Sequence, residues 1–367
     1  MNEFPIEYTS TCAQSPLVFS IMSPTLLLGP LHELQWMLHD SDLVRLMRST
    51  RVLYVDVYRT VALPWLFYPF GLLARSTRPV PALRCVELGN VDHNLHHVFS
   101  GDGLKGVRVL RCKNVESACI CLLSVALESN RSITTLYLSG NRICAQGALC
   151  LAQAFKANVS VKTVDLSDNR ISDMGTSCVA EALKTNQSIT VLNLSSNLIP
   201  PVGVSYLAEA LKTNQSVSVL DLSDNLVGCT GVSYLAGALQ ITQSIATLNL
   251  SDNSIGDAGT CSLAETLKTN RSITALGLQF NEIGDTGVFA LSGALKINQS
   301  IAALNLRENQ ISDIGASYFA EALKLNPRIT FLDLSSNKIC AAGVASLVAT
   351  RGRILPSPRG GGPNVGS

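Results

Sequence analysis

An asparagine returns every 28 residues along most of this chain, and no other feature restricts its possible folds as strongly. It occupies eight positions with no insertion or deletion between them: Asn141, Asn169, Asn197, Asn225, Asn253, Asn281, Asn309 and Asn337. A leucine column (Leu138 to Leu334) and a glycine column (Gly147 to Gly343) keep the same step. A fixed step means that each unit is one supersecondary element whose core is completed by its neighbours. The sequence therefore predicts an elongated stack of repeats.

Each repeat begins with a short apolar alternation. In one copy Val217, Leu220, Leu222 and Val227 are expected to point inward, and the alternation around Leu220 and Leu222 predicts a short strand. Asn225 follows, and its amide can both donate to and accept from the backbone of adjacent turns. Because an unsatisfied buried polar group costs about 1–3 kcal/mol, the asparagine column is expected to stabilise every turn of the stack.

The second part of each repeat has a helical pattern. Asp313 is suited to the N-cap of its helix, and Phe319, Ala320 and Leu323 fall on one face. The aspartates expected to cap their own helices in the same way are Asp173, Asp257 and Asp285. Ion pairs are expected on the outer face between Glu181 and Lys184, Glu209 and Lys212, Glu265 and Lys268, and Glu321 and Lys324. The asparagines suited to the turn after each helix are Asn186, Asn214, Asn270, Asn298 and Asn326.

A strand, a turn and a helix in each repeat make a βα unit, so the strands must be parallel with right-handed crossovers. The pattern LxxLxLxxNxI followed by GxxxLAxAL resembles leucine-rich repeats of the ribonuclease-inhibitor type. The residues of the repeat are most similar to those in repeats of NOD-like receptor proteins. The resemblance covers about residues 108–350. It implies an α/β horseshoe solenoid with parallel strands on the concave face and helices on the convex face.

The extent of the repeats predicts three segments. Residues 1–80 are a non-repetitive N-terminal segment, for which a helical cap over the first repeats is favoured and an F-box-like motif is the alternative. Residues 81–350 are the solenoid of eight regular repeats plus atypical N-terminal ones, and residues 351–367 are a disordered tail. The unit at 108–133, preceded by Val86 and Leu88, is interpreted as an atypical starting cap because it has Arg108 and Lys113 where other copies have leucine and asparagine. The last helix is expected to stop at Thr350, so that the final repeat frays or the chain is a truncated product.

The charge balance excludes some partners. With 28 basic and 27 acidic residues the formal net charge is +1, so no whole-chain field favours nucleic acid or an anionic membrane. The apolar stretch from Leu17 to Leu28 is broken by Pro24, and the stretch from Leu63 to Leu73 is too short to span a bilayer. A cytoplasmic protein with a protein partner, and with neither nucleic acid nor a membrane, is therefore expected.

The cysteines and histidines offer little chemistry. The eleven cysteines are odd in number and show no paired spacing, so they are interpreted as small buried thiols in a reducing compartment. His93, His96 and His97 resemble a metal site only weakly, and an ordinary capping segment is favoured. The chain has no P-loop, GxSxG or HExxH motif, so a non-enzymatic protein without a cofactor is expected.

Candidate binding residues lie between the core positions of the strands, where side chains are expected to face the concave side. The acidic members Asp165, Asp168, Asp221, Asp224 and Asp252 are favoured as a solvated face, with attraction of a basic partner as the alternative. The sixth and seventh copies depart from the polar pattern, and drift within one degenerate repeat is the favoured interpretation. The alternative is a binding patch, because an aromatic residue beside an arginine is typical of interface hot spots. The candidates are Tyr137, Asp165, Asp221, Gly277, Gln279, Phe280, Arg307 and Glu308.

Three functional hypotheses follow. The first is a non-enzymatic interaction scaffold that binds a protein of unknown identity on the concave face. The second is a substrate-recognition adaptor of a ubiquitin ligase, because the segment from Asp42 to Tyr54 is similar to the second half of an F-box, although the leading Leu-Pro of that motif is absent. The third is a GTPase-activating protein resembling the Ran activator, for which the loop arginines Arg142 and Arg170 are the candidate functional residues. Ordinary variation at a polar position of the repeat explains these arginines equally well.

Overall fold

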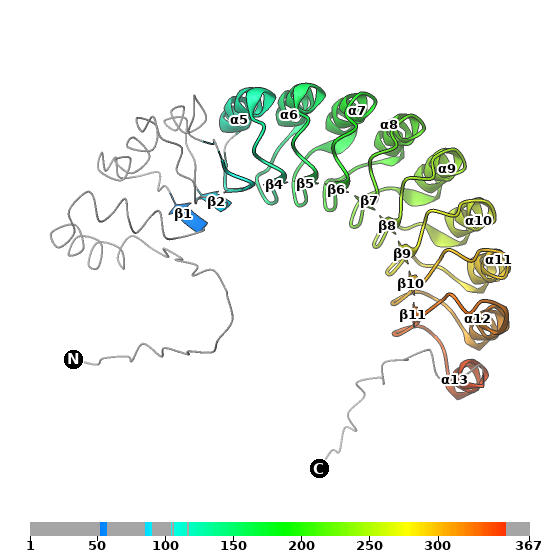
Figure 1. Ribbon diagram of the computed structural model, residues 1–367. Helices are drawn as coiled ribbons and strands as arrows, with labels where there is room; N and C mark the ends of the chain where they lie inside the picture. Colours follow the sequence, from blue (N-terminus) through cyan, green and yellow to red (C-terminus); the bar gives the residue numbers. More distant parts are fainter. Residues whose placement is uncertain (1–51, 57–84, 90–103, 105, 116, 350–367) are drawn as a thin grey trace, which may run out of the picture.

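The computed structural model describes residues 52–56, 85–89, 104, 106–115 and 117–349. These residues form a curved stack in which parallel strands line the inner side and helices cover the outer side (Figure 1). The strands belong to one sheet whose spatial order follows the chain order from β1 to β11. The predicted α/β horseshoe solenoid is therefore confirmed.

Strands and helices alternate regularly from β3 onward. The strands are β1 (Val52–Asp56), β2 (Cys85–Gly89), β3 (Val109–Lys113), β4 (Thr135–Tyr137), β5 (Thr163–Asp165), β6 (Val191–Asn193), β7 (Val219–Asp221), β8 (Thr247–Asn249), β9 (Ala275–Gly277), β10 (Ala303–Asn305) and β11 (Phe331–Asp333). The helices are α5 (Ser117–Ser129), α6 (Ala145–Ala157), α7 (Ser172–Leu183), α8 (Pro201–Leu211), α9 (Gly228–Leu239), α10 (Gly256–Leu267), α11 (Asp285–Leu295), α12 (Asp313–Leu325) and α13 (Ala341–Val348).

The N-terminal end of the sheet extends further than the sequence predicts. Val52 pairs with Cys85, and Cys85 pairs with Val109, so strand pairing continues on the N-terminal side of the unit at 108–133 through β2 and β1. These spacings differ from 28 residues, and a search for the regular step cannot find them. The proposed F-box segment up to residue 51, the three histidines and the tail at 351–367 lie outside the described residues. The segment boundaries at 80 and 350 stay predictions.

The core of each repeat matches the predicted alternation. Val217, Leu220, Leu222 and Val227 are all fully buried. In each strand from β4 to β10 the central residue is buried and its two neighbours are half-buried. Since only alternate side chains face the helices, the others are left on the inner face.

The asparagine column links successive turns as predicted. The Nδ2 of Asn253 donates to the carbonyl oxygens of Leu222, Leu250 and Ser251 at 2.9, 3.2 and 2.9 Å, and its Oδ1 accepts the N–H of Val227 at 3.1 Å. One side chain therefore satisfies four backbone groups, two of them in the preceding repeat.

A second asparagine column follows the helices. The Nδ2 of Asn214 donates to the carbonyl oxygens of Leu183 and Asn186, and its Oδ1 accepts the N–H groups of Ser216 and Val217. Its equivalents at 158, 186, 270, 298 and 326 are buried and bonded to the preceding repeat in the same way. The predicted turn role is confirmed, and the same amides tie each repeat to the one before it.

Glycine lets neighbouring helices approach closely. A Cβ on Gly175 would lie 2.7 Å from the Cγ2 of Ile171, 3.0 Å from the Cβ of Ala148 and 3.2 Å from the Cα of Ala145. The last two atoms belong to the preceding helix α6, where backbone cannot move aside. The regular glycine column therefore sets the spacing of the outer layer.

Three of the four predicted aspartates cap the following helix and not their own, and the N-cap of α7 is Ile171 and not Asp173. The N-cap of α12 is Ser312, whose hydroxyl accepts the N–H of Ile314 at 3.1 Å. The Oδ1 of Asp313 instead accepts the N–H groups of Cys340 and Gly343, at the start of the following helix α13. Asp257 caps α11 and Asp285 caps α12 in the same manner. The packed helices place each carboxylate against the next N-terminus, where the unpaired N–H groups and the helix dipole favour it.

The predicted ion pairs on the outer face are all present. Nζ–Oε distances are 2.7 Å for Lys184–Glu181 and 2.5 Å for Lys212–Glu209, Lys268–Glu265 and Lys324–Glu321. The hydrogen bond from Lys184, together with its charge, lowers the pKa of the Glu181 carboxyl, and Lys324 has the same effect on the pKa of Glu321. Because these side chains are exposed, the pairs contribute little to stability.

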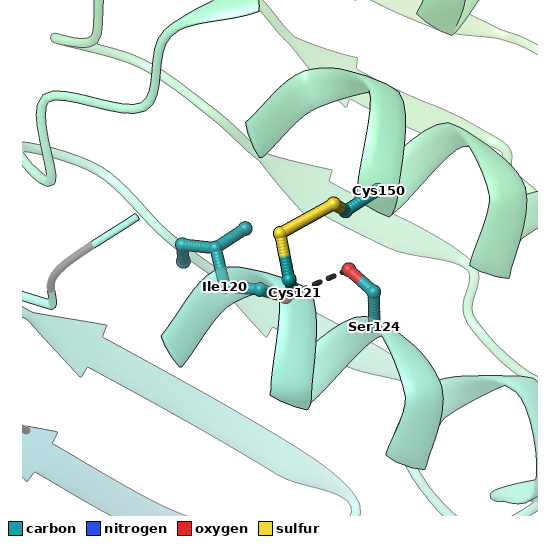
Figure 2. Close-up of a disulfide and its surroundings, with 4 residues drawn as sticks. All are labelled: Ile120, Cys121, Ser124 and Cys150. Atoms are coloured by element: carbon teal, nitrogen blue, oxygen red, sulfur yellow. Dashed lines mark hydrogen bonds between the residues drawn. A yellow bond between two sulfur atoms is a disulfide. The ribbon is translucent and has the colours of Figure 1, made fainter. Parts of the chain in front are cut away.

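The interpretation of the cysteines as buried thiols is wrong for several of them. Cys121 of α5 and Cys150 of α6 form a disulfide with a Cα–Cα distance of 5.2 Å, shown in Figure 2 beside the hydrogen bond from Ser124 to Ile120. Cys229 and Cys340 are exposed, whereas Cys112 and Cys119 are buried as predicted. The disulfide joins residues 29 apart, and the same diagonal joins Ser233 to Ser262 by a hydrogen bond and Phe289 to Tyr318 by an edge-to-face ring contact. These side chains of adjacent helices contact one another at a separation of 29 residues, and a comparison of the sequence at the 28-residue step does not find such pairs.

Candidate protein-interaction surface

The inner face consists of side chains that alternate with the buried ones along each strand. On β7, Asp221 is half-buried beside the fully buried Leu220 and Leu222. Its partners in register are Asn193 on β6 and Asn249 on β8. Equivalent residues of successive repeats therefore form columns with one member per strand, about 4.8 Å apart.

In the regular repeats the outward polar groups are held by their own turn. The Oδ1 of Asp165 accepts the N–H of Ser167 at 3.0 Å and its hydroxyl at 2.7 Å, and Asp221 makes the same pair of bonds with Ser223. The Oδ2 of Asp221 also accepts the Nδ2 of Asn249 at 3.0 Å. The predicted site residues Asp165 and Asp221 are thus engaged within the solenoid and are only partly available to a ligand.

Tyr137 has a partner that the sequence analysis did not single out. The guanidinium of Arg111 lies over the Tyr137 ring, 3.9 Å from its centroid, as a cation–π pair. The two residues are in register on β3 and β4. The pairing could not be predicted because their separation in sequence is not the regular 28 residues.

The repeat of β9 lacks the bonds that Asp165 and Asp221 make with their serines in other repeats. A Cβ on Gly277 would lie 2.5 Å from the Oδ1 of Asn249, so glycine leaves room for that amide. With no side chain at 277, residue 279 has no acceptor of the kind that Ser167 and Ser223 use. The Oε1 of Gln279 is buried and has no hydrogen-bond partner. A buried acceptor without a donor is unusual in a folded protein.

Phe280 combines exposure with an unfavourable backbone conformation. Its φ is +57°, in the left-handed region that bulky side chains rarely adopt, and 47% of the residue is exposed. Its N–H donates to the carbonyl oxygen of Arg307 at 3.1 Å, which brings these two predicted residues together. Arg307 is exposed, and its Nη2 lies 3.4 Å from the Oε1 of Glu308.

The predicted residues fall into two groups. Tyr137 on β4 and Gly277 on β9 are five strand spacings apart, roughly 24 Å at about 4.8 Å per spacing. Gly277, Gln279, Phe280, Arg307 and Glu308 are neighbours on two adjacent repeats. They form the candidate site, which we refer to as the β9–β10 patch.

Exposed apolar residues nearby were missed by the sequence analysis. Phe331 is 51% exposed and pairs in register with Ala303, at the first position of β11 and β10. Leu198 and Leu226 directly follow two asparagines of the column and are 60% and 59% exposed. Large apolar residues at positions where other repeats have threonine or arginine were the available signal.

Other candidate chemistry is weakly supported. The loop arginines Arg142 and Arg170 are exposed. Within the described ranges no group of three or more His, Cys, Asp and Glu side chains could hold a metal ion. Of the helices in the described part of the chain, none combines the length and apolar character needed to cross a membrane.

Comparison with known proteins supports the repeat architecture. The profile of the family described as "Leucine Rich repeat" matches seven segments: 129–152, 157–180, 185–208, 213–236, 243–264, 269–292 and 298–320. No curated protein matches the sequence significantly.

Several solved structures are similar to parts of the chain. An internalin (inlF) from Listeria monocytogenes is 16% identical with a TM-score of 0.44, covering 73% of this chain and 72% of its own. The tropomodulin C-terminal domain of Caenorhabditis elegans is 19% identical with a TM-score of 0.35, covering 41% and 91%. Leiomodin-1 Actin-Binding Site 2 is 22% identical with a TM-score of 0.29, covering 32% and 69%. Superposition this weak carries no argument about function.

Proposed function

Because this chain is a leucine-rich repeat protein, we propose that it is a protein-interaction scaffold whose β9–β10 patch binds a protein partner. The observation that carries the proposal is Phe280. Two features of Phe280 lower the stability of the folded chain. Its aromatic side chain is exposed to solvent, and its left-handed backbone conformation costs about 1–2 kcal/mol of strain. Strain of this kind is typical of functional sites.

The rest of the patch fits an interface. Arg307 offers a guanidinium that can pair with a partner carboxylate or stack on a ring, and arginine and aromatic residues dominate interface hot spots. The Oε1 of the half-buried Gln279 has no donor within the described residues, so a donor group of a partner would satisfy it. The alternative functions rest on residues outside the described part of the chain or on exposed arginines that no neighbouring group orients, so the scaffold is preferred.

The test compares two phenylalanines of one repeat. Phe280→Ala combined with Arg307→Ala is expected to remove a set of proteins from proximity labelling in the native cell, without lowering the melting temperature of the purified chain. Phe289→Ala is the matched control, since Phe289 is 63% exposed on α11 of the same repeat but on the outer face. Identical labelling by the double variant, the control and the wild type would refute the proposal.

A candidate partner then needs a direct measurement. Calorimetric titration of a protein lost from the labelled set is expected to show binding to the wild type and to Phe289→Ala, with at least a tenfold weaker affinity for the double variant. Truncation of a hot-spot residue costs about 2 kcal/mol or more, and about 1.4 kcal/mol corresponds to a tenfold change in affinity.

A further inference from the structure

Each asparagine of the column is flanked by one residue before it and one after it, at the carboxyl ends of the strands. We refer to the residues that flank Asn197, Asn225, Asn253, Asn281 and Asn309 as the loop ridge. Backbone hydrogen bonds join its successive turns. The N–H of Asp224 donates to the carbonyl oxygen of Ser251 at 2.8 Å, that of Asp252 to Gln279 at 2.9 Å and that of Phe280 to Arg307 at 3.1 Å. Side chains 28 residues apart are therefore neighbours along the ridge.

The ridge carries acidic residues and no basic ones. Its carboxylates belong to Asp224, Asp252, Glu282 and Glu308, and its other members are serine, glutamine, leucine and phenylalanine. Asp224 accepts a hydrogen bond of 2.6 Å from the hydroxyl of Ser196, while Asp252 and Glu282 are exposed. Glu308 lies beside Arg307, which is not a member of the ridge. Like charges on adjacent turns repel one another, so a bound cation would stabilise them.

Large apolar residues alternate with these carboxylates. Leu198, Leu226 and Phe280 are 60%, 59% and 47% exposed. Leu198, like Phe280, has a left-handed backbone, with φ of +56°. Neither exposure nor this conformation of a bulky residue favours folding.

Other repeats of the same chain show that the fold does not require these residues. Arg142 and Arg170 occupy the position of Leu198 and Leu226. Ser336 occupies the position of Phe280 with the same φ of +57°. Since serine and arginine are accommodated in the same turn geometry elsewhere, the large apolar residues of the ridge call for a reason other than folding.

Resting on the proposed function, we infer that the loop ridge binds a positively charged protein segment that also carries apolar side chains. Lysine or arginine of the partner pairs with Asp224 and Asp252, and an apolar side chain packs between Leu226 and Phe280. Charge complementarity selects this occupant, because nucleic acid and anionic membranes carry the same sign as the ridge. The segment continues the contact that the β9–β10 patch begins.

The experiment uses random peptides of about twelve residues displayed against the full chain, a length that covers the ridge in either helical or extended form. Enriched peptides are expected to carry net positive charge and at least one leucine, isoleucine or aromatic residue. One such synthetic peptide is then titrated calorimetrically at about 0.1 M and about 1 M salt, where the Debye length falls from about 10 Å to about 3 Å and binding weakens.

The variants assign the contact to the ridge. Asp224→Asn with Asp252→Asn is expected to lower peptide affinity about two- to fivefold per carboxylate, the range for exposed ion pairs. Glu265→Gln with Glu321→Gln is the matched control, because it changes net charge equally on the helices. Leu226→Arg, which copies Arg170, is expected to keep the melting temperature and to abolish peptide binding.

Four outcomes decide between the alternatives. Enrichment of acidic or uncharged peptides, or equal affinity for the aspartate variant and its control, overturns this inference. Self-association in sedimentation that Asp224→Asn with Asp252→Asn disrupts identifies a second copy as the occupant and overturns it as well. Loss of a native partner through Phe280 and Arg307 with no effect of the aspartates leaves the proposed function standing alone. Peptide binding that depends on the aspartates and on Leu226, together with native-partner binding that Phe280→Ala with Arg307→Ala leaves unchanged, overturns the proposed patch instead.

Discussion

The repeats of β7 and β9 have the same backbone but treat their outward polar groups differently. In the β7 repeat, Ser223 bonds to Asp221 through both its N–H and its hydroxyl. In the β9 repeat, Gly277 and Gln279 occupy the same two positions, and the Oε1 of Gln279 has no partner. The first turn satisfies its outward polar groups, whereas the second leaves the buried Oε1 of Gln279 without a donor and the ring of Phe280 exposed.

This difference separates scaffold from site. The asparagine column, the glycine column and the inward leucines continue unchanged through both repeats, so nothing in the core marks β9. The change is confined to side chains that the core does not use. Within an array of near-identical units, residues whose substitution costs the fold little, or even stabilises it, are the ones free to specify a partner.

The largest expected effect tests whether the scaffold is the same in both regions. Asn253→Ala and Asn281→Ala are each predicted to lower the free energy of unfolding by about 2–5 kcal/mol, since several buried backbone groups lose their partners at about 1–3 kcal/mol each. Asn281 Oδ1 accepts the N–H groups of Asn253 and Ile255, and Asn253 Oδ1 accepts the N–H of Val227 in the preceding repeat. Urea denaturation measures both, and Ser254→Ala beside the column serves as the control.

Similar losses for the two variants would support a common scaffold. A loss at Asn281 of less than half that at Asn253 would mean that the β9 turn is already weakened, and the comparison would then describe a defect in folding and not a site.

The next effect concerns the outer layer. Gly175→Ala is predicted to lower the free energy of unfolding by about 1–3 kcal/mol, because its Cβ would overlap Ile171 and approach the backbone of Ala145. Gly237→Ala on α9 is the matched control, since a Cβ there meets nothing within 4 Å, and it is predicted to stabilise by roughly 0.5–1 kcal/mol. Thermal denaturation of both variants checks the opposite signs, and a stabilised Gly175→Ala would contradict the packing account.

Much of the fold could be predicted because the repeat fixes it many times over. The 28-residue step places the strands, the helices and the asparagine bonds, and the four ion pairs follow from helical spacing alone. The caps made by Asp257, Asp285 and Asp313 could not be predicted, because they depend on how far one helix is staggered against the next. The disulfide and strand β1 could not be predicted for a related reason, because the residues that they join are separated by spacings other than 28.

The candidate site could be predicted less completely. Departure from the repeat pattern identified Gly277, Phe280 and Arg307, which the structure places together. The acidic column of the inner face added Asp165 and Asp221, whose bonds to serines only the structure reveals. The left-handed backbone of Phe280 is a property of the turn, and composition does not show it.

Phe280 provides a test in which stability and binding move in opposite directions. Phe280→Asp restores the residue found at Asp224 and Asp252, where the backbone has the same left-handed conformation. It is predicted to raise the free energy of unfolding by about 1 kcal/mol, since aspartate tolerates this region better than a bulky residue. Partner binding is predicted to be lost. Denaturation and calorimetric titration give the two readouts, and a destabilised variant would show that the ring contributes to the fold.

The smallest expected effect compares the two turns directly. Ser223→Ala removes the hydroxyl that donates to Asp221 and is predicted to lower the free energy of unfolding by about 0.5–1.5 kcal/mol without changing partner affinity. Gln279→Ala removes a buried acceptor that has no donor, so its effect on unfolding is predicted to be smaller, while partner affinity falls. Denaturation and titration of both variants separate these expectations. A larger loss of stability for Gln279→Ala than for Ser223→Ala would mean that the β9 turn is as self-sufficient as the others, and the distinction between scaffold and site would lose its basis.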